Sequence, residues 1–126
     1  MVDESTRPLP QYARLFDGVA VRAPIPVGSI ADITFVTSRK TAVDEVNQIL
    51  TEEADTERYV GVIGVSREPL VSSDIVGDPR ASIVDLELTK VIDGDLVKVM
   101  SWYDNEWGYA NQMVREALST ARSAGH

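Results

Sequence analysis

The sequence predicts an α+β fold: a mostly antiparallel sheet with helices on one face, plus a C-terminal helix. First, Asp93-Gly94 stands between two apolar runs, and this pair is typical of hairpin turns because both turn positions need φ > 0. Second, apolar residues after Tyr109 recur at the spacing of one helix face. They are Ala110, Met113, Val114, Ala117, Leu118 and Ala121. Third, about five expected strands outnumber the two expected helices, which favours this layered class.

The N-terminal part predicts two strands. Residues 19–22 alternate between apolar and other residues, as a half-buried strand does. The prolines at 24 and 26 exclude a helix or a central strand there. Residues 29–38 read as the second strand, with one face formed by Ala31, Ile33 and Phe35.

The middle of the chain predicts a helix. Thr41 followed three residues later by Asp44 is a typical helix start, in which the Thr caps the first turn. The expected buried stripe is Val43, Val46, Ile49 and Leu50. Acidic residues cluster at its end: Glu52, Glu53, Asp55 and Glu57. We interpret this cluster as a solvated face, because a metal site needs more convergent oxygens.

Three further strands are expected, over residues 59–65, 82–92 and 96–102. In the second of them, one face should carry Val84, Leu86, Leu88 and Ile92, and the other Asp85 and Glu87. The glycines at 61 and 64 are no dinucleotide fingerprint, because the Gly-x-Gly-x-x-Gly spacing is missing.

The net charge and the lengths of the apolar runs argue against several classes of function. The formal net charge is −8 and the sequence pI is near 4.5, which disfavours nonspecific nucleic-acid binding. No apolar run is long enough to span a membrane, and the polar, acidic start does not resemble a signal peptide. We expect a cytoplasmic protein.

The sequence contains no cysteine, and its one histidine is His126. A thiol nucleophile or a Ser-His mechanism within this chain is therefore not expected, nor is a cysteine-based metal site.

The junction between the last strand and the last helix, residues 102–109, concentrates polar and aromatic residues. It contains both tryptophans and two of the four tyrosines. Asp104 or Asn105 could simply cap the last helix, since both side chains accept from first-turn N–H groups. The aromatic rings could equally be core packing.

Residues 102–109 read Trp-Tyr-Asp-Asn-Glu-Trp-Gly-Tyr. This stretch closely resembles the segment that joins the catalytic sheet to the C-terminal helix in glyceraldehyde-3-phosphate dehydrogenases. Further similar stretches follow in the same order from about Leu9 to Glu116. They include residues 18–26, 28–29, 32–34, 45–47, 61–63, 69–75 and 82–85.

The resemblance implies roles for three residues. Arg22 matches an arginine that binds a phosphate group of the substrate, and a guanidinium suits phosphate because it donates two parallel bonds. Asn105 matches an asparagine that hydrogen-bonds the nicotinamide carboxamide, and Tyr109 a tyrosine that lines the nicotinamide pocket. Structural alternatives remain for each: packing of the Arg22 stem, helix capping by Asn105 and core packing of Tyr109. Ala23 and Gln112 replace a commoner Val and Arg of the family.

The resemblance also implies parts that this sequence does not contain. In the family, a Rossmann domain binds the cofactor, a catalytic cysteine attacks the aldehyde, and a histidine takes its proton. We therefore expect residues 9–104 to be part of a catalytic domain, after a flexible lead-in at 1–8 and before a C-terminal helix and tail at 105–126. The parent would use NAD or NADP, while the isolated chain would be inactive and bind no cofactor. A homo-oligomer is expected. The alternatives are a stand-alone assembly or protein-binding module and one chain of a split enzyme.

Overall fold

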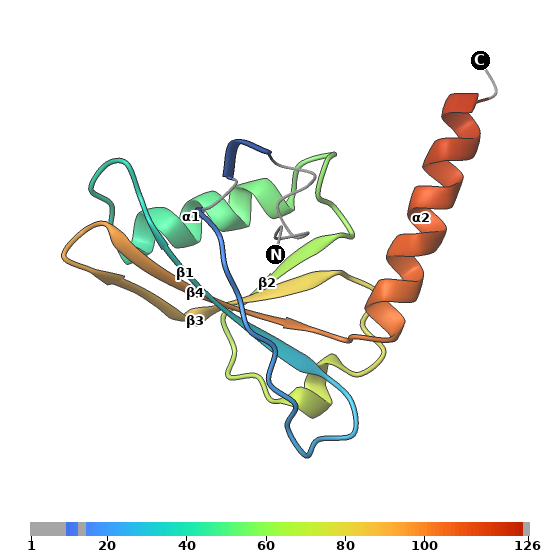
Figure 1. The fold of residues 1–126 in the computed structure, drawn as a ribbon, viewed down its shortest axis with the longest axis horizontal. Coiled ribbons are helices and arrows are strands. Elements are labelled where there is room, and N and C mark those ends of the chain that lie inside the picture. The colour runs from blue at the N-terminus through green and yellow to red at the C-terminus, as the bar shows by residue number, and fades with distance from the viewer. Residues whose placement is uncertain (1–9, 13–14, 125–126) are drawn as a thin grey trace.

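A four-stranded mixed sheet forms the body of the protein in this computed structural model, which describes residues 10–12 and 15–124 (Figure 1). The strands are β1 (Ser29–Val36), β2 (Ile63–Ser66), β3 (Ser82–Ile92) and β4 (Leu96–Tyr103). Their order across the sheet is β1-β4-β3-β2. The β1–β4 and β3–β4 pairs are antiparallel, and β2 runs parallel to β3. The α+β class expected from the sequence is confirmed.

Two helices accompany the sheet, α1 (Val43–Ala54) and α2 (Trp107–Ala124). Short 3-10 turns lie at Pro10–Tyr12 and Ser72–Ile75. Helix α1 covers one face of the sheet, whereas α2 extends away from the end of β4 (Figure 1). The core lies beneath α1, where Val46 and Leu50 pack against the sheet. The sheet residues of this core are Val84, Leu86, Val97 and Val99, with Ile63, Val65 and Val91 beside them. Ile49, expected in the buried stripe, is 47% exposed.

The hairpin between β3 and β4 forms as the sequence predicts. Asp93 has φ 50° and Gly94 has φ 76°, so both turn residues occupy the left-handed region. An irregularity between Asp85 and Lys90 shifts the register of β3 against β4. This bulge reverses which residues face the core, because side chains alternate along a strand. Leu88 and Ile92 are therefore 39% and 60% exposed, whereas Val91 packs against the core.

Three further local expectations were wrong. Residues 19–22 form no strand, and Val19 and Val21 are 89% and 84% exposed. Prolines close by cannot donate to a sheet ladder, and the neighbouring segment that does pair with β4 is β1. Residues 59–62 form turns, so β2 begins only at Ile63. Thr41 does not cap α1: Ala42 is the N-cap residue, and the Thr41 hydroxyl instead donates to Glu45.

Candidate functional site at the junction of β4 and α2

Asp104 holds the junction together. Its carboxylate Oδ1 accepts from the backbone N–H groups of Glu106 and Trp107, at 2.9 and 2.8 Å, so Asp104 caps the first turn of the last helix. Oδ2 accepts from the Gly77 N–H at 2.9 Å, which ties the loop before β3 to the same carboxylate. Asp104 is 4% exposed. The N–H groups of Gly77, Trp107 and Glu106 lower the pKa of this carboxyl group, because they stabilise its charged form.

Asn105 points to a different part of the chain. Its Oδ1 accepts from the Gly28 N–H at 3.3 Å and from the Ser29 hydroxyl at 3.4 Å. These bonds fasten the junction to the start of β1. Of the two capping candidates, Asp104 therefore performs the capping and Asn105 does not. The Asn105 side chain is exposed, and within the described structure its amide N–H₂ group donates to no other residue.

Tyr109 lies one helical turn beyond Asn105. Tyr109 belongs to the first turn of α2, which begins at Trp107. The Tyr109 side chain is 67% exposed and Trp107 is 54% exposed. Core packing therefore does not explain these two aromatic residues.

Arg22 lies in the irregular segment that precedes β1, and its side chain is exposed. It makes no hydrogen bond or ion pair with the residues the structure describes. Six residues later, Gly28 is held by Asn105. The chain thus connects the Arg22 segment to the junction, but no contact brings the Arg22 side chain to Asn105 or Tyr109.

Arg80, which was not among the site residues predicted from the sequence, also supports the junction. Arg80 forms a two-pronged ion pair with Asp78, with Nε–Oδ1 at 2.9 Å and Nη2–Oδ2 at 2.6 Å. This pair raises the pKa of Arg80 and lowers that of Asp78. The Arg80 guanidinium lies against Gly64, and its carbonyl lies against Gly108 in α2. The Asp-Pro-Arg spacing and the two glycines were visible in the sequence, but only the fold brings them together.

Gln112, which departs from the family pattern, also contacts this loop. Its Nε2 donates to the Pro79 carbonyl at 3.0 Å. Gln112 therefore links α2 to the segment before β3.

Two hollows lie on the described surface. One, about 340 Å³, is lined by residues of α1 and Arg67. The other, about 750 Å³, runs between α2 and Val62. Neither is lined by Arg22, Asn105 or Tyr109. In the described ranges, no cluster of acidic or histidine side chains is arranged to hold a metal ion. No helix among them is long and apolar enough to cross a membrane.

Comparison of the sequence with known proteins identifies its family. A model described as "Glyceraldehyde 3-phosphate dehydrogenase, C-terminal domain" matches residues 4–105. A glyceraldehyde-3-phosphate dehydrogenase of Zymomonas mobilis is 44% identical over 115 residues, which is 91% of this chain and 34% of the relative. One from Mycobacterium tuberculosis is 50% identical over 106 residues, or 84% of this chain and 31% of the relative. The chain thus spans about a third of the length of these relatives. It belongs to the glyceraldehyde-3-phosphate dehydrogenase C-terminal domain family.

Proposed function

We propose that this chain is a C-terminal catalytic-domain portion of a phosphorylating glyceraldehyde-3-phosphate dehydrogenase. The parent reaction is the NAD(P)-dependent oxidation and phosphorylation of glyceraldehyde 3-phosphate to 1,3-bisphosphoglycerate, a step of glycolysis in the cytoplasm. Residues 9–104 would be the partial catalytic domain, and residues 105–126 its C-terminal helix and tail. The observation that carries the proposal is the geometry of Asn105 at the junction. Its amide oxygen accepts hydrogen bonds from Gly28 and Ser29, and the residue is exposed.

The residues present fit a nicotinamide cofactor at the junction. A carboxamide both donates and accepts, and the Asn105 amide N–H₂ group is available to it as a donor. The Tyr109 ring is exposed on the same side of the helix start and offers an aromatic wall. The cofactor, when bound, supplies the hydride acceptor. The chain's own residues orient its ring, and the Gly28 and Ser29 bonds fix the Asn105 side chain for that purpose.

Arg22 would bind a phosphate group of the substrate. Its exposed guanidinium makes no competing ion pair in the described structure, so its donors are available to an anion. The segment that carries it leads to Gly28, which Asn105 holds. The substrate phosphate and the nicotinamide would thus be bound by residues of two segments, and the Gly28–Asn105 hydrogen bond joins these segments.

The test is a full-length hybrid. The matching 106 residues of the Mycobacterium tuberculosis relative are replaced by those of this chain, and NADH formation from glyceraldehyde 3-phosphate, phosphate and NAD is followed. We expect an active hybrid. Arg22→Ala should then lower kcat/KM by about 10- to 1000-fold, because a charge-assisted contact to the substrate is lost.

The matched control is Arg58→Ala, because Arg58 is also an exposed arginine but lies over the Tyr59 ring. It should leave kcat/KM unchanged. A folded but inactive hybrid would contradict the proposed function. An active hybrid in which Arg22→Ala has no effect would remove only the phosphate role of Arg22.

A stand-alone assembly or protein-binding module is the second candidate. One observation favours it: α2 exposes large apolar side chains, among them Met113, Val114 and Leu118. An inactive hybrid together with a chain that assembles alone would support this candidate instead.

A further inference from the structure

The start of β1 determines which way the amide of Asn105 is turned. Its Oδ1 accepts from the backbone N–H of Gly28 at 3.3 Å and from the Ser29 hydroxyl at 3.4 Å. A carboxamide has one oxygen that accepts and one N–H₂ group that donates. Because the Gly28 N–H can only donate, it must face the amide oxygen; a turned amide would set two donors against each other. The backbone at Gly28 therefore decides the orientation of this amide.

Gly28 in turn fits closely against the 3-10 turn at Ser72–Ile75. Its φ is 96°, in the left-handed region that favours glycine. A Cβ at this position would lie 3.2 Å from the Ser72 carbonyl oxygen and 3.3 Å from Cδ1 of Ile75. In Figure 1 the turn lies beside the chain that enters β1. Ile75 is 1% exposed, so its side chain has no space into which it could move. The Gly28 N–H is thus placed by its packing against this turn.

The same turn is connected to the junction a second time, through Asp104. Two residues after Ile75, the Gly77 N–H donates to Oδ2 of Asp104 at 2.9 Å. Asp104 and Asn105 are neighbours in the sequence, and each accepts from a glycine that contacts or follows the turn. The contacts form a closed ring, which restricts the position of Asn105 more than one hydrogen bond would.

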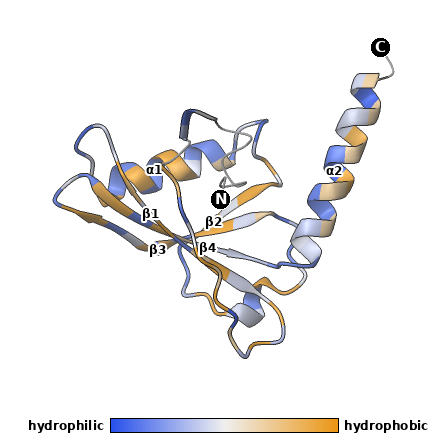
Figure 2. Ribbon diagram, in the orientation of Figure 1, coloured by the Kyte–Doolittle hydropathy of each residue, from blue (hydrophilic) through white to orange (hydrophobic). Residues whose placement is uncertain are grey.

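Apolar packing contributes little at the junction itself. Figure 2 shows the end of β4 and the start of α2 in pale to hydrophilic colours, whereas hydrophobic residues are frequent along α1 and the strands beneath it. The Asn105 side chain is also exposed. Its orientation therefore depends on the polar contacts with β1 and on the packing that places Gly28.

We propose that Ser29 and Ile75 are positioning residues for the nicotinamide cofactor, and that both act through Asn105. Ser29 acts directly, by restricting rotation of the amide. Ile75 acts by way of Gly28, whose N–H it keeps against the amide oxygen. A binding group that is already oriented loses less conformational entropy when its ligand binds. The proposal rests on the proposed function, because it takes Asn105 as a cofactor-binding residue.

The contact between Gly28 and Asn105 is tested first in the chain without cofactor. In an amide NMR spectrum, Asn105→Ala should move the Gly28 proton signal upfield, because its acceptor is lost. Asn105→Asp should move it little, because a carboxylate still offers an oxygen to Gly28. The Gly18 signal is the internal control, since the Gly18 N–H donates to Asp17. A Gly28 signal that is unchanged in Asn105→Ala would overturn the proposal.

The role of Ser29 is tested in the full-length hybrid, with NAD and with ADP-ribose, which lacks the nicotinamide. Ser29→Ala should raise the Kd for NAD by about 3- to 10-fold, because one hydrogen bond is lost. It should leave the Kd for ADP-ribose unchanged. Ser29→Thr retains the hydroxyl and should restore the affinity for NAD. The matched control is Ser66→Ala, which removes a hydroxyl that bonds the backbone of Glu68 at the end of β2. It should change neither Kd.

The role of Ile75 is tested by removing only the methyl group that lies against Gly28. Ile75→Val should raise the Kd for NAD by about 2- to 5-fold, because a small displacement of the amide weakens its bond to the ligand. Ile83→Val deletes the same group from another buried isoleucine, in β3, and should leave the Kd unchanged. Equal effects of the two variants would remove Ile75 from the proposal.

A double-mutant cycle separates positioning from general loosening of the fold. In the Asn105→Ala background, Ser29→Ala should have no further effect on the Kd for NAD, because its effect passes through the missing amide. Effects that multiply would overturn the proposal, and so would a Ser29→Ala hybrid with an unchanged Kd for NAD. An unmodified hybrid that binds ADP-ribose and NAD equally would instead contradict the cofactor role of Asn105 in the proposed function. Circular dichroism confirms that every variant is folded.

Discussion

At the residue scale, one buried carboxylate organises the junction. Asp104 is the acceptor for three backbone N–H groups from two segments, and its burial means that water cannot replace it when it is removed. The Asp104 carboxylate therefore fixes the start of α2 and the loop before β3 on either side of one residue.

We expect Asp104→Ala to lower the free energy of unfolding by about 2–4 kcal/mol, because a helix cap is lost and buried donors are left unpaired. Urea denaturation measures this. Asp74→Ala is the control, since the Asp74 carboxylate accepts from the Val71 N–H but is exposed; it should cost less than about 1 kcal/mol. Equal costs would show that Asp104 is not the anchor.

The same carboxylate makes stability depend on pH. Its folded pKa lies below the ordinary value of 3.8, so its stabilisation is complete above that value and is lost as the pH falls through the folded pKa. The difference in stability between the natural chain and Asp104→Ala should therefore shrink below pH 3.8.

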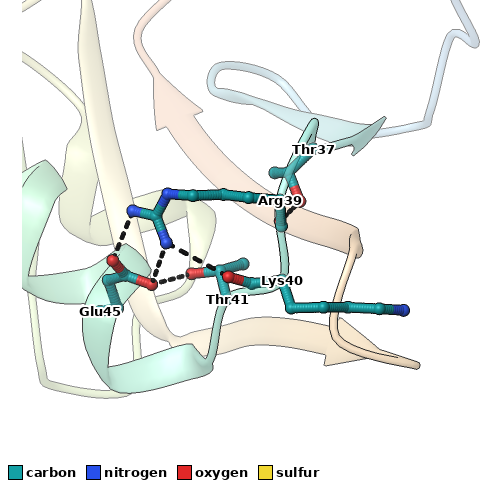
Figure 3. A network of polar contacts seen from close by, with 5 residues as sticks. All are labelled: Thr37, Arg39, Lys40, Thr41 and Glu45. Carbon is teal, nitrogen blue, oxygen red and sulfur yellow. Dashed lines mark hydrogen bonds and ion pairs between the residues drawn. The ribbon is translucent and has the colours of Figure 1, made fainter.

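Before α1, a surface network sets the ionisation of a second carboxylate. The Arg39 guanidinium donates to both Glu45 oxygens, at 2.6 and 3.1 Å, and the Thr41 hydroxyl adds a third bond (Figure 3). The Arg39 bonds contribute most, and with Thr41 they lower the pKa of Glu45 to about 2. The network is exposed to solvent, so its effect is on ionisation more than on stability.

Arg39→Met should raise the pKa of Glu45 from about 2 toward its ordinary value of 4.5, because the Thr41 bond alone remains. An NMR titration of the carboxyl group measures the shift. Since the folded pKa is depressed, the contribution of Glu45 is present above pH 4.5 and is lost as the pH falls toward 2. Lys40→Met is the control, because the Lys40 ammonium pairs with Asp95. A Glu45 that titrates unchanged in the Arg39 variant would contradict the assignment.

At the element scale, the attachment of α2 depends on close backbone approach. A Cβ on Gly108 would lie 2.7 Å from the Arg80 carbonyl oxygen, which is closer than van der Waals contact allows. Backbone cannot move aside as a flexible side chain can, so only glycine lets the start of α2 rest on the segment before β3.

Gly108→Ala should therefore destabilise the protein by about 1–3 kcal/mol, even though alanine favours a helix by about 1 kcal/mol. Chemical denaturation followed by tryptophan fluorescence reports this loss. Gly18→Ala is the matched control, since nothing lies within 4 Å of the added carbon there. A stabilised Gly108→Ala variant would show that α2 does not rest on Arg80.

At the scale of the whole molecule, the roles proposed for Arg22, Asn105 and Tyr109 are binding roles. The chain's 126 residues contain no cysteine, and the one histidine is His126. The candidate groups are an amide, a phenol ring and a guanidinium, which bind and orient but do not attack an aldehyde.

We expect the purified chain to form no NADH from glyceraldehyde 3-phosphate, phosphate and NAD above a no-protein control. Calorimetry should detect no NAD binding at micromolar affinity, because Asn105 and Tyr109 alone give a small contact area. The active hybrid enzyme serves as the positive control for both measurements. Turnover by contaminant-free chain, or micromolar NAD binding, would contradict this expectation.

The sequence by itself determined the features that depend on neighbouring residues. The Asp93-Gly94 turn follows from a local need for φ > 0, and the spacing of apolar residues predicts both helices. The α+β class and the family also follow, because the junction octapeptide and the order of the matching stretches are readable along the chain. These predictions required no knowledge of which segments meet in space.

Only the tertiary structure decided the features that depend on distant segments. The bulge in β3 turned Val91 inward and Leu88 outward, because the register against β4 overrides simple alternation. Asp104 became the cap and Asn105 the link to β1, because Gly77 and Gly28 approach the junction from other parts of the chain. The apolar side of α2 faces outward for the same reason: the backbone carbonyls of Val60 and Pro79 engage its polar side. A periodic pattern shows that a helix has an apolar side, but the surrounding chain decides where that side points.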